Sequence, residues 1–324
     1  MIALFLNFQK QVNLIINDRV IRYAVTKKST LNKVVDYGEK FIDVNIIEDG
    51  KIINQKAFQS VLERLVRDKK WKRANLFFTV HDASVTIREQ MVPKGLVKEE
   101  IKQYIFMELE ENIRLPFTDP VLDFAIIGEE EEQTKILLFA YPKDRLQPYI
   151  SAFEKVGLKP KVADFSALSI YRLYFELDMA QKKEHLLMVQ WRIDAVVLTA
   201  FYQQKPIFTR YVKSTLNQED WTWRANSNAL DWTGEKADFD QNIDEQLVTI
   251  ERFLDFYRYS VSNGEEQITK ILLTGELPVL DAISERLQDQ FNLPVVSMRT
   301  LEQQKSLPAK YADVLGLVLK PLHG

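Results

Sequence analysis

Few side chains in this sequence can carry covalent catalysis or bind a metal ion. Cysteine is absent, which excludes disulfides, thiolate zinc sites, iron–sulfur clusters and cysteine nucleophiles together. The three histidines, His81, His185 and His323, lie far apart in the sequence. We therefore expect no multi-histidine metal site and no serine–histidine–aspartate triad, and we interpret His81 and His185 as structural.

The glycine content disfavours phosphate chemistry. Glycine accounts for 10 of 324 residues, which is about half of the usual share of roughly 7%. Loops that cradle phosphates use glycine because their backbone N–H groups must approach the phosphate oxygens closely. This composition leaves little glycine for such loops.

A basic cluster surrounds Trp71 and comprises Lys69, Lys70, Lys72 and Arg73. Such a cluster can lie on anionic lipid. Its position between a helical pattern and a buried strand favours a solvated turn instead. Neither this cluster nor the formal net charge of -3 favours a nucleic-acid partner.

The elements that would position these residues are those of an α/β protein. A chain of 324 residues is long enough for about two domains. Alternating apolar residues predict an opening meander of three strands, at 2–6, 12–16 and 20–25, with a tight turn at Asn17-Asp18 between the last two. A buried strand at 74–79 follows.

Residues 85–165 are predicted to form an inserted module of the order βαββαβ. The expected strands are 85–92, 121–127, 135–141 and 161–165, and the expected helices are 98–113 and 143–156. Pro116 prevents the first of these helices from continuing, and Gly157 ends the second.

The opening pattern returns in the second half of the chain. Strands at 186–190, 195–202 and 206–212 form a second meander, and a polar stretch at 213–242 with three tryptophans follows it. The repetition predicts a duplicated fold. The expected divisions are a first subdomain of residues 1–84 and 166–184, the module at 85–165, and a second domain at 185–324 that includes a variable subdomain at about 213–266.

Several segments resemble the superfamily of actin, Hsp70 and the sugar kinases. Two segments resemble its phosphate hairpins, LFLNFQKQVNLIINDRVIRYAV and LLMVQWRIDAVVLTAFYQQKPIFTRYV, and one resembles its adenosine region, ERFLDFYRYSVSNGEEQITKILLTGELPVLDAISERL. Their order and spacing resemble more closely the PilM family of type IV pilus assembly, related to FtsA, whose pattern the module segment NIRLPFTDPVLDF also resembles. The resemblance covers nearly the whole chain. It implies an actin-like (ribonuclease H-like) duplicated two-domain α/β fold with an inserted βαββαβ module.

The same resemblance implies a nucleotide cleft, and the first hairpin departs from the superfamily pattern of aspartate, one residue and glycine. Asn7 and Gln9 stand at those two places, and Lys10 follows where a small hydroxyl residue is usual. Asn7 supplies no negative charge to a magnesium shell. Gln9 places a side chain where the backbone should approach a phosphate.

The second hairpin and the adenosine loop depart in the same way. Gln190 and Arg192 replace the aspartate and the glycine, and Glu276 stands where a second glycine would follow Gly275. Arg192 could meet a phosphate, but we favour a role in filling an empty cleft or in a surface ion pair. Phosphoryl transfer needs charge neutralisation and close positioning. These departures from the superfamily pattern predict a pseudo-ATPase for which no cofactor is certain, with binding of ATP and magnesium disfavoured but left open.

The resemblance also implies a partner. In this family the module and the first domain form a groove for the short cytoplasmic tail of a PilN-like membrane protein. We expect Leu115, Pro116 and Phe117, together with Ile101 and Ile105, to line it and to bind an extended or short amphipathic peptide. The alternative is that these five residues belong to the core of the module.

The resulting expectation is a cytoplasmic scaffold of a type IV pilus or competence-pilus machine, which contacts the assembly platform or motor proteins. No stretch of about 18 apolar residues and no signal-peptide pattern is present, so we expect a partner to hold the chain at the inner face of the membrane. The main alternative is an active or nucleotide-regulated ATPase of the same machine, in which Arg192 and Lys10 replace metal charge. A filament-forming protein like FtsA is a third possibility.

Overall fold

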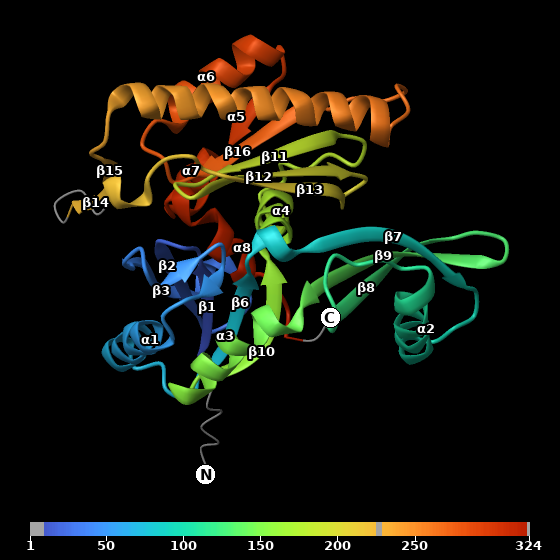
Figure 1. The fold of residues 1–324 in the computed structure, drawn as a ribbon, viewed down its shortest axis with the longest axis horizontal. Helices are drawn as coiled ribbons and strands as arrows, with labels where there is room; N and C mark the ends of the chain where they lie inside the picture. Colours follow the sequence, from blue (N-terminus) through green and yellow to red (C-terminus); the bar gives the residue numbers. More distant parts are fainter. Residues whose placement is uncertain (1–9, 225–228, 323–324) are drawn as a thin grey trace.

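The computed structural model describes residues 10–224 and 229–322, which form two five-stranded sheets one above the other (Figure 1). The first sheet has the order β10-β6-β1-β2-β3. Its strands are β1 (Gln11–Ile16), β2 (Val20–Thr26), β3 (Val34–Phe41), β6 (Asn75–Val80) and β10 (Lys159–Phe165). Strands β1 to β3 are antiparallel, whereas β6 runs parallel to both β1 and β10.

The second sheet repeats this topology, with the order β13-β12-β11-β16-β17. Its strands are β11 (His185–Trp191), β12 (Ala195–Tyr202), β13 (Lys205–Lys213), β16 (Lys270–Gly275) and β17 (Val295–Ser297). An antiparallel meander is again extended by parallel strands beside its first member. The predicted duplication is confirmed.

The first meander differs from its prediction. Its three strands are β1, β2 and β3, so it begins at Gln11 and includes β3, a strand that was not predicted. The expected strand at 2–6 lies outside the described residues.

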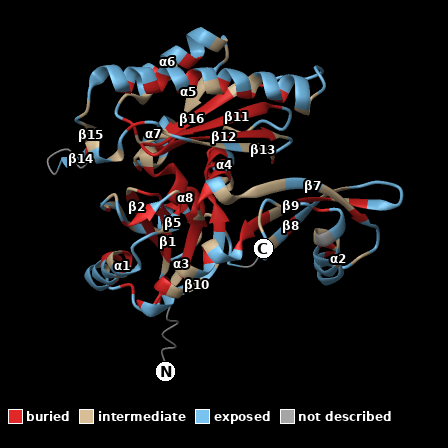
Figure 2. Ribbon diagram, viewed as in Figure 1, coloured by how far each residue is buried: buried red, intermediate tan, exposed pale blue. Residues whose placement is uncertain are grey.

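Helices cover both sheets and also separate them (Figures 1 and 2). Leu14 and Ile16 of β1 face α1 (Gln55–Lys69) and α3 (Lys143–Lys155) on the outer side. Ile15, one residue along, faces the layer of α4 (Ser166–Glu176) and α8 (Ala312–Val318), because successive strand side chains alternate.

The α4 and α8 layer joins the two domains in one apolar core, since its cluster includes residues of both sheets. The far side of the second sheet is covered by the amphipathic α5 (Lys236–Phe256) and α6 (Leu280–Phe291). A short helix, α7 (Arg299–Lys305), follows β17.

The inserted module is smaller than expected. Its three-stranded sheet has the order β7-β9-β8, and its elements are β7 (Thr86–Pro93), α2 (Lys98–Glu111), β8 (Pro120–Glu129) and β9 (Gln133–Pro142). Strand β10 pairs instead with β6 of the first sheet, and α3 packs in the core of the first domain. The module therefore spans 86–142 rather than 85–165.

Two hairpins complete the fold. The small pair β4 (Ile47–Glu48) and β5 (Lys51–Ile52) turns at Asp49 and Gly50. The polar stretch that was expected to be variable contains β14 (Trp221–Arg224) and β15 (Ala229–Trp232). Trp221 is buried against Trp232 and against Phe239 of α5.

The close contact of α8 with α4 gives a first prediction. A Cβ atom on Gly316 would lie 1.9 Å from the carbonyl oxygen of Ser169, so Gly316→Ala must push the two helices apart. We expect the substitution to lower the free energy of unfolding by about 1–3 kcal/mol, measured by urea denaturation. Gly128→Ala is the control, because its Cβ would meet no atom closer than 3.9 Å; equal effects of the two substitutions would contradict the prediction.

Candidate functional site

The turns of two hairpins meet in the cleft between the domains. Residues 17–19 join β1 to β2, and residues 192–194 join β11 to β12. The Nη1 atom of Arg192 donates to Oδ1 of Asn17 at 3.2 Å. The duplicated topology therefore brings equivalent turns of the two domains into direct contact.

This geometry corrects the assignment of the first hairpin. The last residues of the two leading strands are Ile16 and Trp191, so the counterpart of Gln190 is Ile15 and that of Arg192 is Asn17. Lys10 is exposed at the opposite end of β1 and takes no part in the cleft.

The other two predicted residues of that hairpin, Asn7 and Gln9, lie outside the described residues. Ile15, whose apolar side chain is 1% exposed, stands at the aspartate position of the first phosphate hairpin, where Asn7 was predicted. The duplication itself was the signal that would have placed the turn correctly, because the turn at Asn17-Asp18 was already evident in the sequence.

Arg192 is buried among carboxylates. Its Nη1 lies 2.9 Å from Oδ2 of Asp82, and its Nε lies 3.3 Å from Oδ1 of Asp194. Burial lowers the pKa of Arg192, but the charges of Asp194 and Asp82 outweigh this effect and raise it above its ordinary value. Gln190 lies beside this network, with Oε1 2.8 Å from Oγ of Ser166, which also contacts Asp82.

A second buried ion network crosses the cleft at Glu276. Arg22 of β2 pairs with Glu39, with Asp313 and with Glu276 of the second domain. The backbone N–H of Ile193 also donates to Glu276 at 3.0 Å. Glu276 is therefore held by an arginine and a backbone amide.

Gly275 allows the adjacent chain to pass closely. A Cβ atom there would lie 2.0 Å from the carbonyl oxygen of Trp191. A polar hollow of about 670 Å³ opens beside Gly275 and Glu276, and Asp281, Ser284 and Arg299 contribute to its walls.

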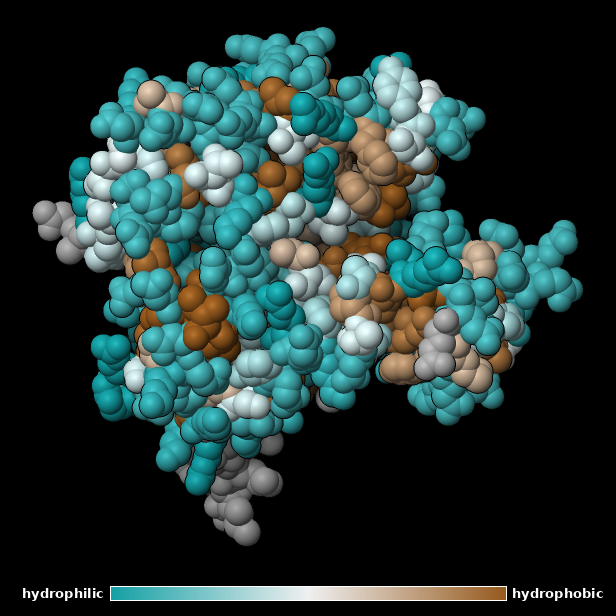
Figure 3. Space-filling view, viewed as in Figure 1, coloured by the Kyte–Doolittle hydropathy of each residue, from teal (hydrophilic) through white to brown (hydrophobic). Residues whose placement is uncertain are grey.

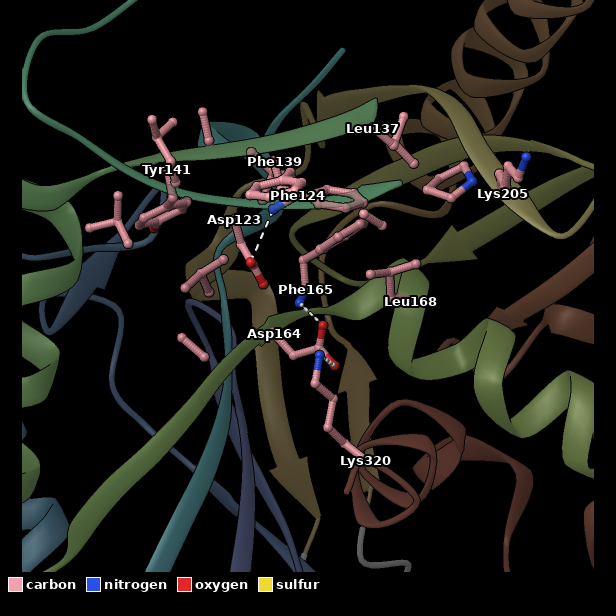
Figure 4. A pocket seen from close by; sticks show the side chains of 18 of the residues that line it. Asp123, Phe124, Leu137, Phe139, Tyr141, Asp164, Phe165, Leu168, Lys205 and Lys320 are labelled. Atoms are coloured by element: carbon pink, nitrogen blue, oxygen red, sulfur yellow. Dashed lines mark hydrogen bonds and ion pairs between the residues drawn. The ribbon is translucent and has the colours of Figure 1, made fainter. Parts of the chain in front are cut away.

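A separate apolar groove lies where the module meets the first domain (Figure 4). Its volume is about 390 Å³. One wall is β8, an edge strand of the module's sheet, and another is β10, an edge strand of the first sheet. Phe139 and Phe165 project into the groove, and their ring centroids are 5.5 Å apart.

The second domain also borders the groove, through the tip of the β12–β13 hairpin. Gln204, Lys205 and Pro206 line it there, and Nζ of Lys205 donates to the carbonyl oxygen of Ile127 in β8 at 2.9 Å. The carboxyl groups of Asp123 and Asp164 also line the groove, and Asp164 is paired with Lys320 and Arg172 at its base. Hydrophobic atoms are also visible on the module and beside the notch that separates it from the second domain (Figure 3).

The predicted partner-binding residues do not line this groove. Ile101 and Ile105 are each 1% exposed in the module core, so their assignment to an open groove was wrong. Leu115 packs partly against the same cluster. Pro116 is exposed and Phe117 is half-buried at the module corner.

The basic cluster around Trp71 forms a turn at the end of α1, which is the interpretation that the sequence favoured. Trp71 is 2% exposed and packs edge-to-face on Tyr23. Lys69 pairs with Asp36 at 3.0 Å, and Lys70 has the left-handed conformation of a helix cap. His185 is structural, because its Nδ1 lies 2.7 Å from the hydroxyl of Tyr257.

A duplicated α/β fold with a small module inserted in its first half, and with a cleft between matching hairpins, defines the class of actin-like proteins. The family model described as type IV pilus assembly protein PilM matches residues 16–215, and the chain belongs to this family.

Solved structures agree on the fold. The PilM–PilN type IV pilus biogenesis complex contains a chain with a TM-score of 0.75 at 16% identity, covering 96% of this chain and 99% of that one. A Bacteroides thetaiotaomicron protein with an actin-like ATPase fold matches with a TM-score of 0.51 at 12% identity, covering 99% and 100%. EutJ of Carboxydothermus hydrogenoformans matches with 0.51 at 10% identity, covering 96% and 89%. No curated protein matches the sequence.

Proposed function

We propose that this chain is a scaffold of a type IV pilus assembly machine that binds the cytoplasmic tail of a PilN-like membrane protein. The observation that carries the proposal is the apolar groove between β8 and β10. The similar fold in a PilM–PilN complex supports it.

The groove suits an extended peptide because two edge strands form its walls. Edge strands can pair with an added strand through their backbones, while apolar pockets select its side chains. Six of the lining residues come from one stretch of β8, Val121 to Ile127, and three from β10, Ala163 to Phe165. The expected ligand is therefore an extended segment with apolar side chains on alternate positions.

Binding should be measured with a synthetic peptide of the cytoplasmic tail of a PilN-like protein from the same organism. We expect saturable binding by the full chain in the absence of nucleotide. Phe117→Glu tests the alternative that the peptide binds at the module corner. If this variant loses binding while charged substitutions in the groove leave binding unchanged, the site lies at that corner. Absence of binding at millimolar peptide would overturn the proposal.

We further propose that the chain lacks ATPase activity. The two positions that should carry the metal-orienting carboxylates hold Ile15 and Gln190, and the buried side chains of Arg22 and Arg192 with their carboxylates occupy the space between the turns. These residues do not fit a magnesium–nucleotide, which needs carboxylates at the metal and open backbone at the phosphates.

Calorimetry with ATP and ADP, with and without magnesium, tests this proposal. We expect no binding at millimolar nucleotide. The polar hollow beside Gly275 is the observation that favours the alternative function, a nucleotide-regulated or active ATPase. Tight magnesium-dependent binding, with turnover that falls in Arg192→Ala, would establish that alternative.

None of the helices at 10–224 and 229–322 is long and apolar enough to cross a membrane. We propose that the chain works at the inner face of the cytoplasmic membrane, where the peptide in the groove holds it. Fractionation of cells with and without the PilN-like partner tests this: the chain should leave the membrane fraction when the partner is deleted.

A further inference from the structure

Three buried side chains from the two domains converge beside Arg192. Asp18 lies in the β1–β2 turn, His81 follows β6, and Asp194 lies in the β11–β12 turn. One ligand-type atom from each lies within 4.8 Å of the other two. All three residues are more than nine-tenths buried.

His81 has no hydrogen-bond partner for either ring nitrogen, although it is only 5% exposed. A buried polar atom without a partner is costly and requires an explanation. Both carboxylate oxygens of Asp194 also lack a hydrogen bond, and Nε of Arg192 lies 3.3 Å from Oδ1.

The charges of the cluster are unbalanced. Three carboxylates and one guanidinium act on His81, those of Asp18, Asp82, Asp194 and Arg192. When neutral, the imidazole of His81 offers a lone pair to a metal ion. One divalent cation would balance the two excess negative charges.

The backbone of the β4–β5 turn fixes two of the three side chains. The amides of Asp49 and Gly50 donate to the carboxylate of Asp18 at 2.7 and 2.9 Å. Gly50 also lies against the His81 ring, where a Cβ atom would come within 2.2 Å of Cγ. Such outer contacts are typical of side chains that ligate a metal.

We propose that Asp18, His81 and Asp194 bind a divalent transition-metal ion of the zinc class, which links the first domain to the second. One imidazole and two carboxylates are ligands that such ions accept, with a fourth position for water. Tetrahedral ligands at about 2.1 Å from zinc are about 3.4 Å apart, so the ligand atoms, which lie within 4.8 Å of one another, must approach by up to about 1.4 Å.

This site differs from the magnesium position that the resemblance implies. That position requires carboxylates at Ile15 and Gln190, neither of which carries charge. The proposed site uses a histidine and needs no nucleotide. Its role is to hold the two hairpin turns together, because Asp18 and Asp194 belong to different domains.

The test is titration of the full chain with Zn²⁺ and with Co²⁺, after removal of metals by EDTA and without nucleotide. We expect one equivalent to bind, the visible absorption of four-coordinate Co²⁺, and a rise in melting temperature of about 4 °C when Zn²⁺ reaches 100 times its dissociation constant. Failure of both ions to bind at 1 mM would overturn the proposal.

Two variants and a matched control assign the ligands. His81→Gln and Asp194→Asn should each weaken Zn²⁺ binding at least 100-fold, whereas His185→Gln should leave it unchanged. Binding as tight as that of the natural chain in either of the first two variants would contradict the assignment. If either variant fails to fold, the Co²⁺ spectrum of the natural chain decides, because a spectrum without four-coordinate character would also overturn it.

Gly50 supplies a test of positioning. Gly50→Ala should weaken Zn²⁺ binding at least 10-fold by displacing the His81 ring. Gly95→Ala is the matched control, since both glycines have positive φ, 68° and 87°, but a Cβ at Gly95 meets nothing within 4 Å. Equal affinities of the two variants would show that the β4–β5 turn does not hold the ligand.

Discussion

Replacing Arg192 by alanine is expected to lower the free energy of unfolding by about 3–5 kcal/mol. The substitution leaves the carboxylates of Asp82 and Asp194 buried without their main counter-charge. Two buried anions without a cation are far more costly than a lost surface ion pair. The measurement is denaturant unfolding in the presence of EDTA, so that no metal ion contributes.

Lys213→Ala is the control for this substitution. Lys213 pairs with Asp49 at 3.0 Å, but both side chains are about half exposed. Its loss should cost less than about 1 kcal/mol, because water screens the pair. If Arg192→Ala costs no more than Lys213→Ala, the buried network does not hold the domains together.

The second large effect is expected in the groove. Ala125→Glu should weaken binding of the PilN-like tail peptide at least about 30-fold, since a charge in an apolar contact costs about 2 kcal/mol or more. Ala125 lies on β8, lines the groove and is exposed in the free chain, so the fold should tolerate the change. Ala163→Glu, on the β10 wall, should act in the same way.

Ile126→Glu is the control on the neighbouring residue. Its side chain is 59% exposed and does not line the groove, because successive side chains of a strand point to opposite faces. We expect unchanged peptide affinity, measured by fluorescence anisotropy. Equal losses in Ala125→Glu and Ile126→Glu would argue that the peptide does not occupy the groove.

Local periodicity was sufficient to predict most elements but not their pairing. Strands β8 and β9 and helix α3 lie close to their predicted positions, because their apolar residues alternate or recur every turn. The pairing of β10 with β6 joins residues more than 80 positions apart. No local pattern indicates such a pairing, so the predicted module wrongly included β10.

The site was harder to predict, for a similar reason. Apolar residues alternate at 2–6 as they do in a strand. For this reason the first phosphate hairpin was predicted at Asn7 and not at the turn of Asn17-Asp18. Asp18, His81 and Asp194 are single residues separated by more than 60 positions. Only the duplicated topology, which superposes two hairpin turns across the cleft, brings them together.

The β12–β13 hairpin would make the proposed peptide groove a point of thermodynamic linkage. Its Lys205 contacts β8, so the groove has walls from the module, the first domain and the second domain. A peptide that touches all three walls stabilises one angle between the domains. By reciprocity, a ligand that fixes this angle at Asp18 and Asp194 changes peptide affinity by the same factor that the peptide changes the affinity of that ligand. If both proposed sites bind their ligands, the occupancy of each site changes the affinity of the other.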